Sequence, residues 1–293
     1  MSAPPASAAT AGRARAWTPA ARRLGVVEAR RMLRHPAYPI VMLYAVMFAV
    51  TVRANNEGGP TANFAYSVVS VSVLLIYAPL TFVAANRVAA TTYRSQVRDV
   101  LDATPVDDRQ RTVGAVVGLL LGPVVVGLGG ALVLLMIGES ASPLAPANDR
   151  VYQRTPLEYL QVPAIVLGAG LLGIAVARWL PWPGMLPLTA IALWLGTIVM
   201  YDQHFIVYET TTYEVVPART WFALWPVWFV DMGGMLPRQP LAQEMWHLAY
   251  LLGLGVLAGI AALLRTDGPR RALYVTAGGA VVVTAVAAWL QLG

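Results

Sequence analysis

Long apolar segments recur along the chain and constrain its fold more than any other feature. A membrane-spanning helix needs about 17 to 25 predominantly apolar residues, and seven segments approach or reach that length. They are Tyr38 to Val52, Phe64 to Ala85, Val113 to Ile137, Tyr159 to Leu180, Gly184 to Tyr201, Trp246 to Leu264 and Ala272 to Leu290. We therefore expect an all-α integral membrane protein, a polytopic bundle of six to seven transmembrane helices.

The composition agrees with this class and excludes two kinds of site. Of the 293 residues, 57% are hydrophobic and only 12% are charged, against about 25% charged in a soluble domain. The mean hydropathy is +0.59. The chain has no cysteine, so it has neither a disulfide framework nor a thiolate metal site. All 21 basic residues are arginine, which suggests a high-GC bacterial genome and rules out the lysine of an ordinary P-loop.

Arginines also predict the orientation in the membrane. With the N-terminus inside, sixteen of the 21 arginines lie on the cytoplasmic side and five lie outside, as the positive-inside rule requires. Seven spans then leave the C-terminus outside. This bias accounts for the net charge of +6, so we expect a bacterial cell membrane location with surrounding lipid and no nucleic-acid partner.

The chain before the first apolar segment divides into two parts. Residues 1–19 are rich in Ala, Ser and Pro and lack the apolar core of a signal peptide, so we expect a disordered cytoplasmic tail. We expect residues 20–36 to form an amphipathic helix in the headgroup layer. Its basic face carries Arg23, Arg30 and Arg34, and its apolar face carries Val26, Ala29 and Leu33. Residues 37–293 are then the transmembrane domain.

The longest polar segment between two strongly apolar ones is Tyr93 to Gly114. Apolar residues at i, i+3 and i+4, from Val97 to Leu101, predict a short amphipathic helix outside the bilayer core. Thr104 and Pro105 then suit the N-cap and the first position of a second helix, with an acidic residue in its first turn. We expect a rigid, capped break that a soluble partner could push.

Trp221 to Val230 is apolar but too short to cross the membrane. Counting it as a span would also place the last three arginines outside and reverse the charge bias. Tryptophans at i, i+4 and i+7 make one aromatic face, which is typical of the membrane interface. We expect a re-entrant or interfacial outer helix, interrupted near Pro226.

The polar segment resembles the loop between the first two hairpins of type-2 ABC exporter permeases. That pattern is a helix, then leucine, three residues, proline, a small or hydrophobic residue and a polar or basic one, before the third span. The matching positions are Leu101, Pro105, Val106, Arg109 and Arg111, and the N-terminal elbow helix of the family is matched by Glu28, Arg30, Arg34 and Pro36. The chain departs from the family in having Asp107 and Asp108 after the proline and a seventh helix after the usual six.

The resemblance implies a permease subunit with no catalytic residue. It would pair with a second copy or a related permease and with separate ABC ATPase subunits, which would bind the ATP and Mg²⁺. The residues expected to couple to the ATPase are Glu28, Arg31, Leu101, Asp102, Ala103, Thr104, Pro105, Val106, Asp107 and Asp108.

Four hydroxyl side chains share one face of the second apolar segment at spacings of 4, 7 and 4. They are Tyr66, Ser70, Tyr77 and Thr81. They either line a transport path for an apolar or amphipathic substrate or form hydrogen bonds between helices. Glycines in the third segment, Gly114, Gly118 and Gly122, predict close packing against a neighbouring helix.

A competing hypothesis is an integral-membrane enzyme or an assembly or sensor protein with a polar site outside. Glu244 and His247 have a Glu-x-x-His spacing that can serve a metal ion, but the chain has no second copy of it, so we expect no metal site. The residues available for such an outer site are Asp202, His204, Glu209, Glu214, Glu244 and His247. A transporter-like sensor or immunity protein is a third possibility on the same scaffold.

Overall fold

Every regular element in the described part of the chain is a helix. The computed structural model describes residues 6–35, 38–39, 43, 46–47, 72–91, 106–139, 156–207, 224–225, 241–267 and 269–292. The elements are α1 (Ala6–Leu33), η1 (Val73–Tyr77), α4 (Ala78–Ala90), α6 (Asp108–Leu119), η3 (Leu120–Val124), α7 (Val125–Glu139), α8 (Pro156–Trp179), α9 (Met185–Val207), α10 (Leu241–Leu264) and α11 (Arg271–Leu292). The expected all-α class is confirmed for these residues.

Five helical stretches in these ranges are long and apolar enough to cross a membrane. They are Val73–Ala90, Asp108–Val133, Tyr159–Trp179, Leu241–Leu264 and Arg271–Leu292. The apolar part of α9, Met185–Val199, is shorter. The expected span Tyr38 to Val52 lies mostly outside the described residues, so the structure supports five of the seven expected spans.

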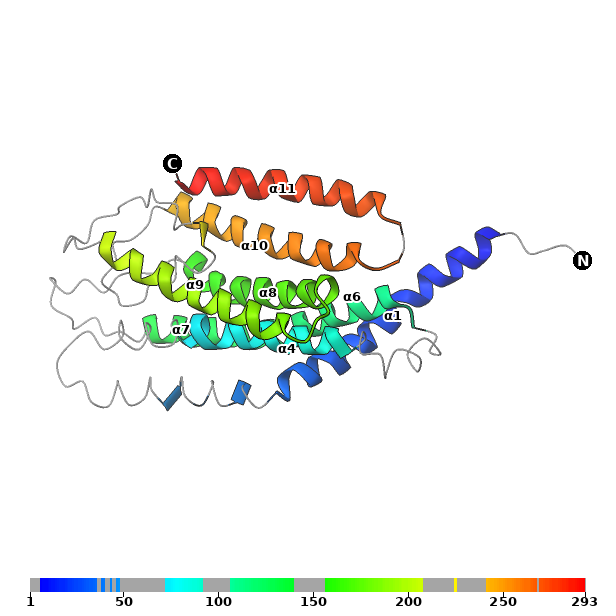
Figure 1. Cartoon of the computed structure of the whole chain (residues 1–293), viewed down its shortest axis with the longest axis horizontal. Helices are drawn as coiled ribbons and strands as arrows, with labels where there is room; N and C mark the ends of the chain where they lie inside the picture. The colour runs from blue at the N-terminus through cyan, green and yellow to red at the C-terminus, as the bar shows by residue number, and fades with distance from the viewer. Residues whose placement is uncertain are drawn as a thin grey trace, which may run out of the picture.

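Helix α8 lies at the centre of the bundle, with α4 on one side and α10 on the other (Figure 1). One core cluster joins α4, α6, α8 and α10 to Met32 of α1, and its fully buried members include Ala85, Leu119 and Ile174. Helix α11 packs along α10, where Gly253 lies directly against Thr284. Its outward face is apolar, with Val275 76% and Trp289 73% exposed, as expected of a lipid-facing surface.

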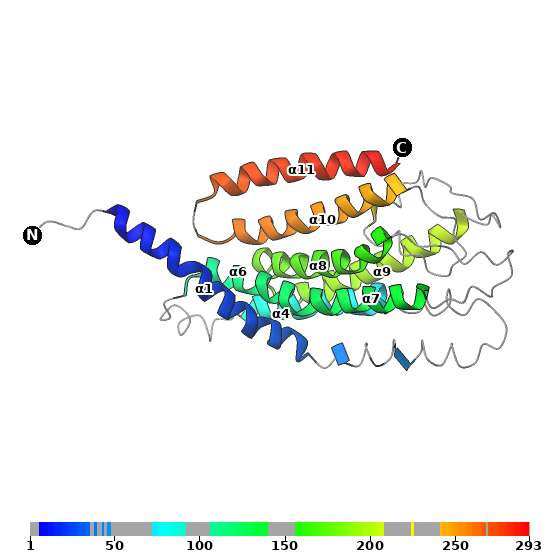
Figure 2. The ribbon, with the colours of Figure 1, turned by 180° about the vertical axis from the view of Figure 1, so that it is seen from behind.

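Helix α1 runs obliquely across the others, and its N-terminal half extends beyond the bundle (Figure 2). It begins at Ala6, so the segment expected to be a disordered tail is helical from that residue. Alanine is the strongest helix former, and the frequent alanines of this segment explain why the helix continues through Pro19 toward the N-terminus. Of the residues 20–36 expected to form a separate amphipathic helix, 20–33 lie in the second half of α1.

In the described ranges, two short π-helices interrupt the long helices. η1 precedes α4, and η3 joins α6 to α7 around Pro123. The Tyr77 hydroxyl, at the end of η1, donates a hydrogen bond of 2.8 Å to the Pro123 carbonyl, and the Trp194 indole of α9 donates one of 3.1 Å to the Leu75 carbonyl. A π-helix and a proline both disturb the regular backbone ladder, so these side chains reach carbonyls at the two irregular sites.

Candidate functional site

The glycines at 114 and 118 of α6 and at 122 of η3 lie directly against α1. A Cβ added at Gly118 would lie 2.9 Å from the Ala29 backbone nitrogen and 3.0 Å from the Gly25 carbonyl oxygen. Gly114 faces Leu24 in the same way, and Gly122 faces Ala29. The predicted close approach is therefore present, and the neighbouring helix is α1. This crossing fixes the second half of α1 against the bundle.

Glu28 and Arg31, the two expected coupling residues of α1, form an ion pair near this crossing. Arg31 Nη1 lies 3.2 Å from Glu28 Oε1, and the Arg31 side chain is 60% exposed while that of Glu28 is only 16% exposed. Within the described residues, Glu28 Oε2 is buried without a hydrogen-bond partner. Burial raises the pKa of Glu28, and the Arg31 charge opposes this only in part. The carboxylate is thus held in an unfavourable, dry position.

Helix α6 begins later than the sequence suggested. Its N-cap is Asp107 rather than Thr104. Asp107 Oδ1 accepts a hydrogen bond of 2.6 Å from the Gln110 backbone N–H, and the Gln110 side chain accepts one of 3.2 Å from the Asp107 N–H. This is a capping box. The Asp-x-x-Gln spacing was a sequence signal that the expectation of a Thr104 N-cap overlooked.

The first residue of α6 also binds the last turn of α8. Arg178 Nη1 lies 2.6 Å from Asp108 Oδ1, and the Arg178 side chain is 1% exposed. The sequence could not identify this pairing, because the two residues are far apart in the chain. A buried guanidinium is stable in such a site only when an anion and hydrogen bonds compensate its lost hydration. The pair joins α6 firmly to α8.

The remaining expected coupling residues are only partly visible. Leu101, Asp102, Ala103, Thr104 and Pro105 lie outside the described residues, and Val106 directly precedes the capping box. Glu28 packs at the level of Gly118, which follows Asp108 by ten residues, or about 15 Å of helix. The structure therefore pairs Glu28 with Arg31 on α1. Asp107 and Asp108 lie at the start of α6, about 15 Å along that helix from the glycine that Glu28 contacts.

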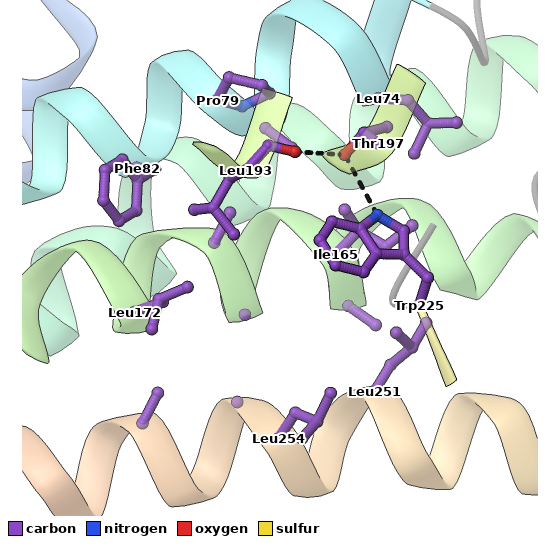
Figure 3. A pocket seen from close by; sticks show the side chains of 16 residues that line it. Leu74, Pro79, Phe82, Ile165, Leu172, Leu193, Thr197, Trp225, Leu251 and Leu254 are labelled. Carbon is purple, nitrogen blue, oxygen red and sulfur yellow. Dashed lines mark hydrogen bonds between the residues drawn. The ribbon is translucent and has the colours of Figure 1, made fainter. Parts of the chain in front are cut away.

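An apolar cavity of ≈ 290 Å³ lies between α4, α8, α9 and α10 (Figure 3). The two polar side chains on its wall bond to each other: the Trp225 indole N–H donates to the Thr197 hydroxyl at 3.2 Å, and Thr197 donates to the Leu193 carbonyl at 2.8 Å. The lining residues are Leu74, Ala78, Pro79, Phe82, Ala164, Ile165, Gly168, Ala169, Leu172, Leu193, Thr197, Trp225, Leu251, Leu254, Gly255 and Ala258.

The two described residues of the expected transport path are not among the cavity residues. The Tyr77 hydroxyl binds the Pro123 carbonyl, and its ring packs edge-on against Tyr38 with centroids 5.3 Å apart. The Thr81 hydroxyl donates to the Tyr77 carbonyl and accepts from Tyr38 at 3.2 Å. These hydroxyls are engaged in hydrogen bonds within and between elements, which is the other interpretation of the pattern. Tyr66 and Ser70 lie outside the described residues.

Leu224 and Trp225 are the described part of the expected outer helix, and they lie against α9 and α10. The Trp225 ring packs against Gly196 in the middle of α9. The Tyr250 hydroxyl donates to the Leu224 carbonyl at 2.8 Å, and Tyr250 follows the first residue of α10 by nine residues, or about 14 Å of helix. These contacts attach the segment to α9 and α10.

The candidate residues for a polar outer site are not gathered into one described cluster. Glu244 and His247 are fully buried on α10, where His247 Nδ1 lies 2.8 Å from the Gln291 side-chain oxygen of α11. The Gln243 side chain donates to the Gln291 carbonyl. Asp202 and His204 are on α9, while Glu209 and Glu214 lie outside the described ranges. Where the structure can be searched, it has no group of three potential metal ligands.

Comparison with known proteins gives no independent assignment. No protein-family model, curated protein or solved structure matches this chain. The function must therefore be argued from the residues and their geometry.

Proposed function

We propose that this chain is the membrane-spanning permease subunit of an ATP-driven exporter of the type-2 ABC class, in a bacterial cell membrane. Separate ATPase subunits bind ATP and Mg²⁺ and act on the segment before α6, and a second permease, identical or related, completes the transporter. The cargo is apolar or amphipathic. The five apolar helical stretches and the resemblance of the polar segment and α1 to this class support the proposal.

The observation that carries the proposal is the Arg178–Asp108 pair. It lies directly after the polar segment on which an ATPase would act. Because the first turn of α6 is capped by Asp107 and bound to α8, a displacement of the segment would move two membrane helices together. A flexible loop would dissipate the same displacement, so this rigid attachment is what a coupling element requires.

Helix α1 suits the role of an elbow in the same transporter. Its second half is fixed to α6 through Gly25 and Ala29, while Arg22, Arg23, Arg30 and Arg34 are exposed. Exposed arginines beside a membrane domain favour the anionic cytoplasmic leaflet. The absence of lysine from the whole chain means that the nucleotide site must be on a partner.

The proposal is tested by affinity purification of the tagged full-length chain from its native membranes, followed by mass spectrometry. We expect an ATPase subunit with a P-loop lysine to co-purify. The double variant Leu101→Glu/Asp102→Arg should abolish its recovery while leaving membrane insertion and thermal stability intact. Asp107 and Asp108 are left unchanged in this variant, because their substitution would also disturb the start of α6.

The matched control is Arg270→Glu, a charge reversal at an exposed position between α10 and α11. It should leave the ATPase bound if docking is specific to the segment before α6. Purification of the unmodified chain without any ATPase, or equal recovery from the double variant, would contradict the proposed coupling.

A further inference from the structure

The apolar cavity has the dimensions of a site for one linear hydrocarbon chain. Its wall extends from Ala164 to Leu172 on α8 and from Leu74 of η1 to Phe82 of α4, each about 12 Å along the helix axis. A volume of ≈ 290 Å³ over that length has room for one extended hydrocarbon chain. The long axis follows the candidate membrane spans.

Small residues create this space. Ala78, Ala164, Ala169, Gly255 and Ala258 face it from three helices. Gly168 also lines it, and a Cβ added there would meet no atom within 4 Å. Elsewhere in the bundle, glycines such as Gly118 are in tight contact with a neighbouring helix, whereas Gly168 borders the space of the cavity.

The side chains that line the cavity favour a ligand without polar groups. The hydroxyl of Thr197 and the indole N–H of Trp225 already bond to each other and to the Leu193 carbonyl (Figure 3). Neither the hydroxyl nor the indole N–H therefore remains available to orient a polar ligand by a hydrogen bond. An apolar protein cavity of about 150 Å³ stays dry and binds benzene, so a larger cavity of the same kind should take up hydrocarbon rather than water.

The surroundings indicate the source of that hydrocarbon. Helices α4, α8 and α10 contribute to three of the candidate membrane spans, and α9 carries exposed apolar side chains at Leu188, Ile191 and Leu195. A chain entering between these helices would come from the surrounding bilayer. We propose that the cavity between α4, α8, α9 and α10 is a binding site for one acyl chain of a membrane phospholipid, with Trp225 in contact with it.

This site does not depend on the proposed coupling to an ATPase, since a chain purified without any ATPase would still bind the lipid. The two proposals therefore fail separately. A loss of ATPase co-purification leaves the lipid site intact, and an empty cavity leaves the coupling segment intact.

The test uses the full-length chain in nanodiscs of phosphatidylcholine brominated on its acyl chains, compared with nanodiscs of the unbrominated lipid. The difference in fluorescence between the unmodified protein and Trp225→Phe reports Trp225 alone. We expect that emission to lose more than about half of its intensity in brominated lipid, because the acyl chain lies in contact with the ring. Gly168→Leu and Ala169→Leu should each restore it by filling the cavity.

The matched control is Gly129→Leu on α7, since Gly129 also has no neighbour within 4 Å but does not line the cavity. It should leave Trp225 as strongly quenched as in the unmodified protein. Native mass spectrometry should show one phospholipid retained per chain in the unmodified protein and in Gly129→Leu, and none in Gly168→Leu. The proposal would be overturned if Trp225 were unquenched in the unmodified protein, if both filled variants were quenched as strongly as the unmodified protein, or if the retained compound were not a phospholipid.

Discussion

The buried guanidinium of Arg178 lies 2.6 Å from the carboxylate of Asp108, and this contact joins the last turn of α8 to the first turn of α6. The two residues differ in exposure, because the Arg178 side chain is 1% exposed and that of Asp108 is 33% exposed. The pair thus has one member that water can reach and one that it cannot, and the two substitutions should have unequal consequences.

Asp108→Asn should destabilise the protein more than Arg178→Met. The first leaves a buried guanidinium without its carboxylate, at a cost of about 3 kcal/mol. The second leaves a carboxylate that water can partly solvate, at a cost of about 1 to 2 kcal/mol. The free energy of unfolding in mixed detergent micelles measures both. The double variant should be less destabilised than the sum of the two, and simple additivity would contradict the pair.

Gly118→Ala should loosen α1 from α6. The new methyl group would lie 2.9 Å from a backbone nitrogen of α1, and backbone cannot move aside as a side chain can, so we expect a cost of about 1 to 3 kcal/mol. Limited trypsin digestion at the arginines of α1 reports the change as faster cleavage. Gly129→Ala is the control, because alanine there meets open space and is favoured in a helix. Equal cleavage rates in the two variants would refute the tight crossing.

The stability of the protein should fall as the pH rises through the titration of Glu28. Burial raises the pKa of this carboxyl above its ordinary value of 4.5 in the folded state. The folded protein therefore binds the proton more tightly than the unfolded chain, and this contribution to stability is complete below pH 4.5 and lost as the pH passes the raised value. Thermal unfolding between pH 4 and pH 8 measures the effect.

Glu28→Gln should remove this part of the pH dependence and raise the stability at pH 7, because a neutral amide costs less to bury than a carboxylate. Arg31→Gln serves as the comparison. It removes the charge that opposes the shift while keeping Glu28, so it should make the total fall in stability larger and extend it to higher pH. A Glu28→Gln protein with an unchanged pH profile would show that the carboxyl is not the titrating group.

Tyr77→Phe should cost about 1 kcal/mol, the usual value of a hydrogen bond between membrane helices. The substitution removes the bond to the Pro123 carbonyl and keeps the ring that packs against Tyr38. Unfolding free energies in detergent provide the measurement. Tyr274→Phe on the exposed face of α11 is the control and should change stability by less than about 0.5 kcal/mol. A neutral Tyr77→Phe would mean that the bond between η1 and η3 adds nothing.

The apolar segments predicted the helices well where length and hydropathy decide the structure. The expected span Tyr159 to Leu180 corresponds to Pro156–Trp179, and the expected span Ala272 to Leu290 corresponds to Arg271–Leu292. Helix ends were harder, because a cap depends on a few side-chain bonds. Thr104 and Asp107 both suited an N-cap, and only the bonds to Gln110 distinguish them.

The candidate site was predictable in part. The spacing of Gly114, Gly118 and Gly122 indicated close packing, since it places three residues without side chains on one face. It could not indicate α1 as the partner. The spacing of Tyr77 and Thr81 likewise placed two hydroxyls on one face of a helix, but it could not decide between a path and hydrogen bonds. The cavity left no sequence signal, because its small residues come from separate helices.

The sequence by itself determined that this chain forms apolar helices of membrane-spanning length and that it cannot bind ATP through a P-loop lysine. Both conclusions rest on residue types within one segment or on the absence of a residue type from the whole chain. The tertiary structure alone decided that Arg178 binds Asp108, that α1 crosses α6 and that a cavity remains beside Trp225. Each of these depends on which helix faces are brought together in space. The periodicity of one helix shows its own apolar face but not which helix packs against that face.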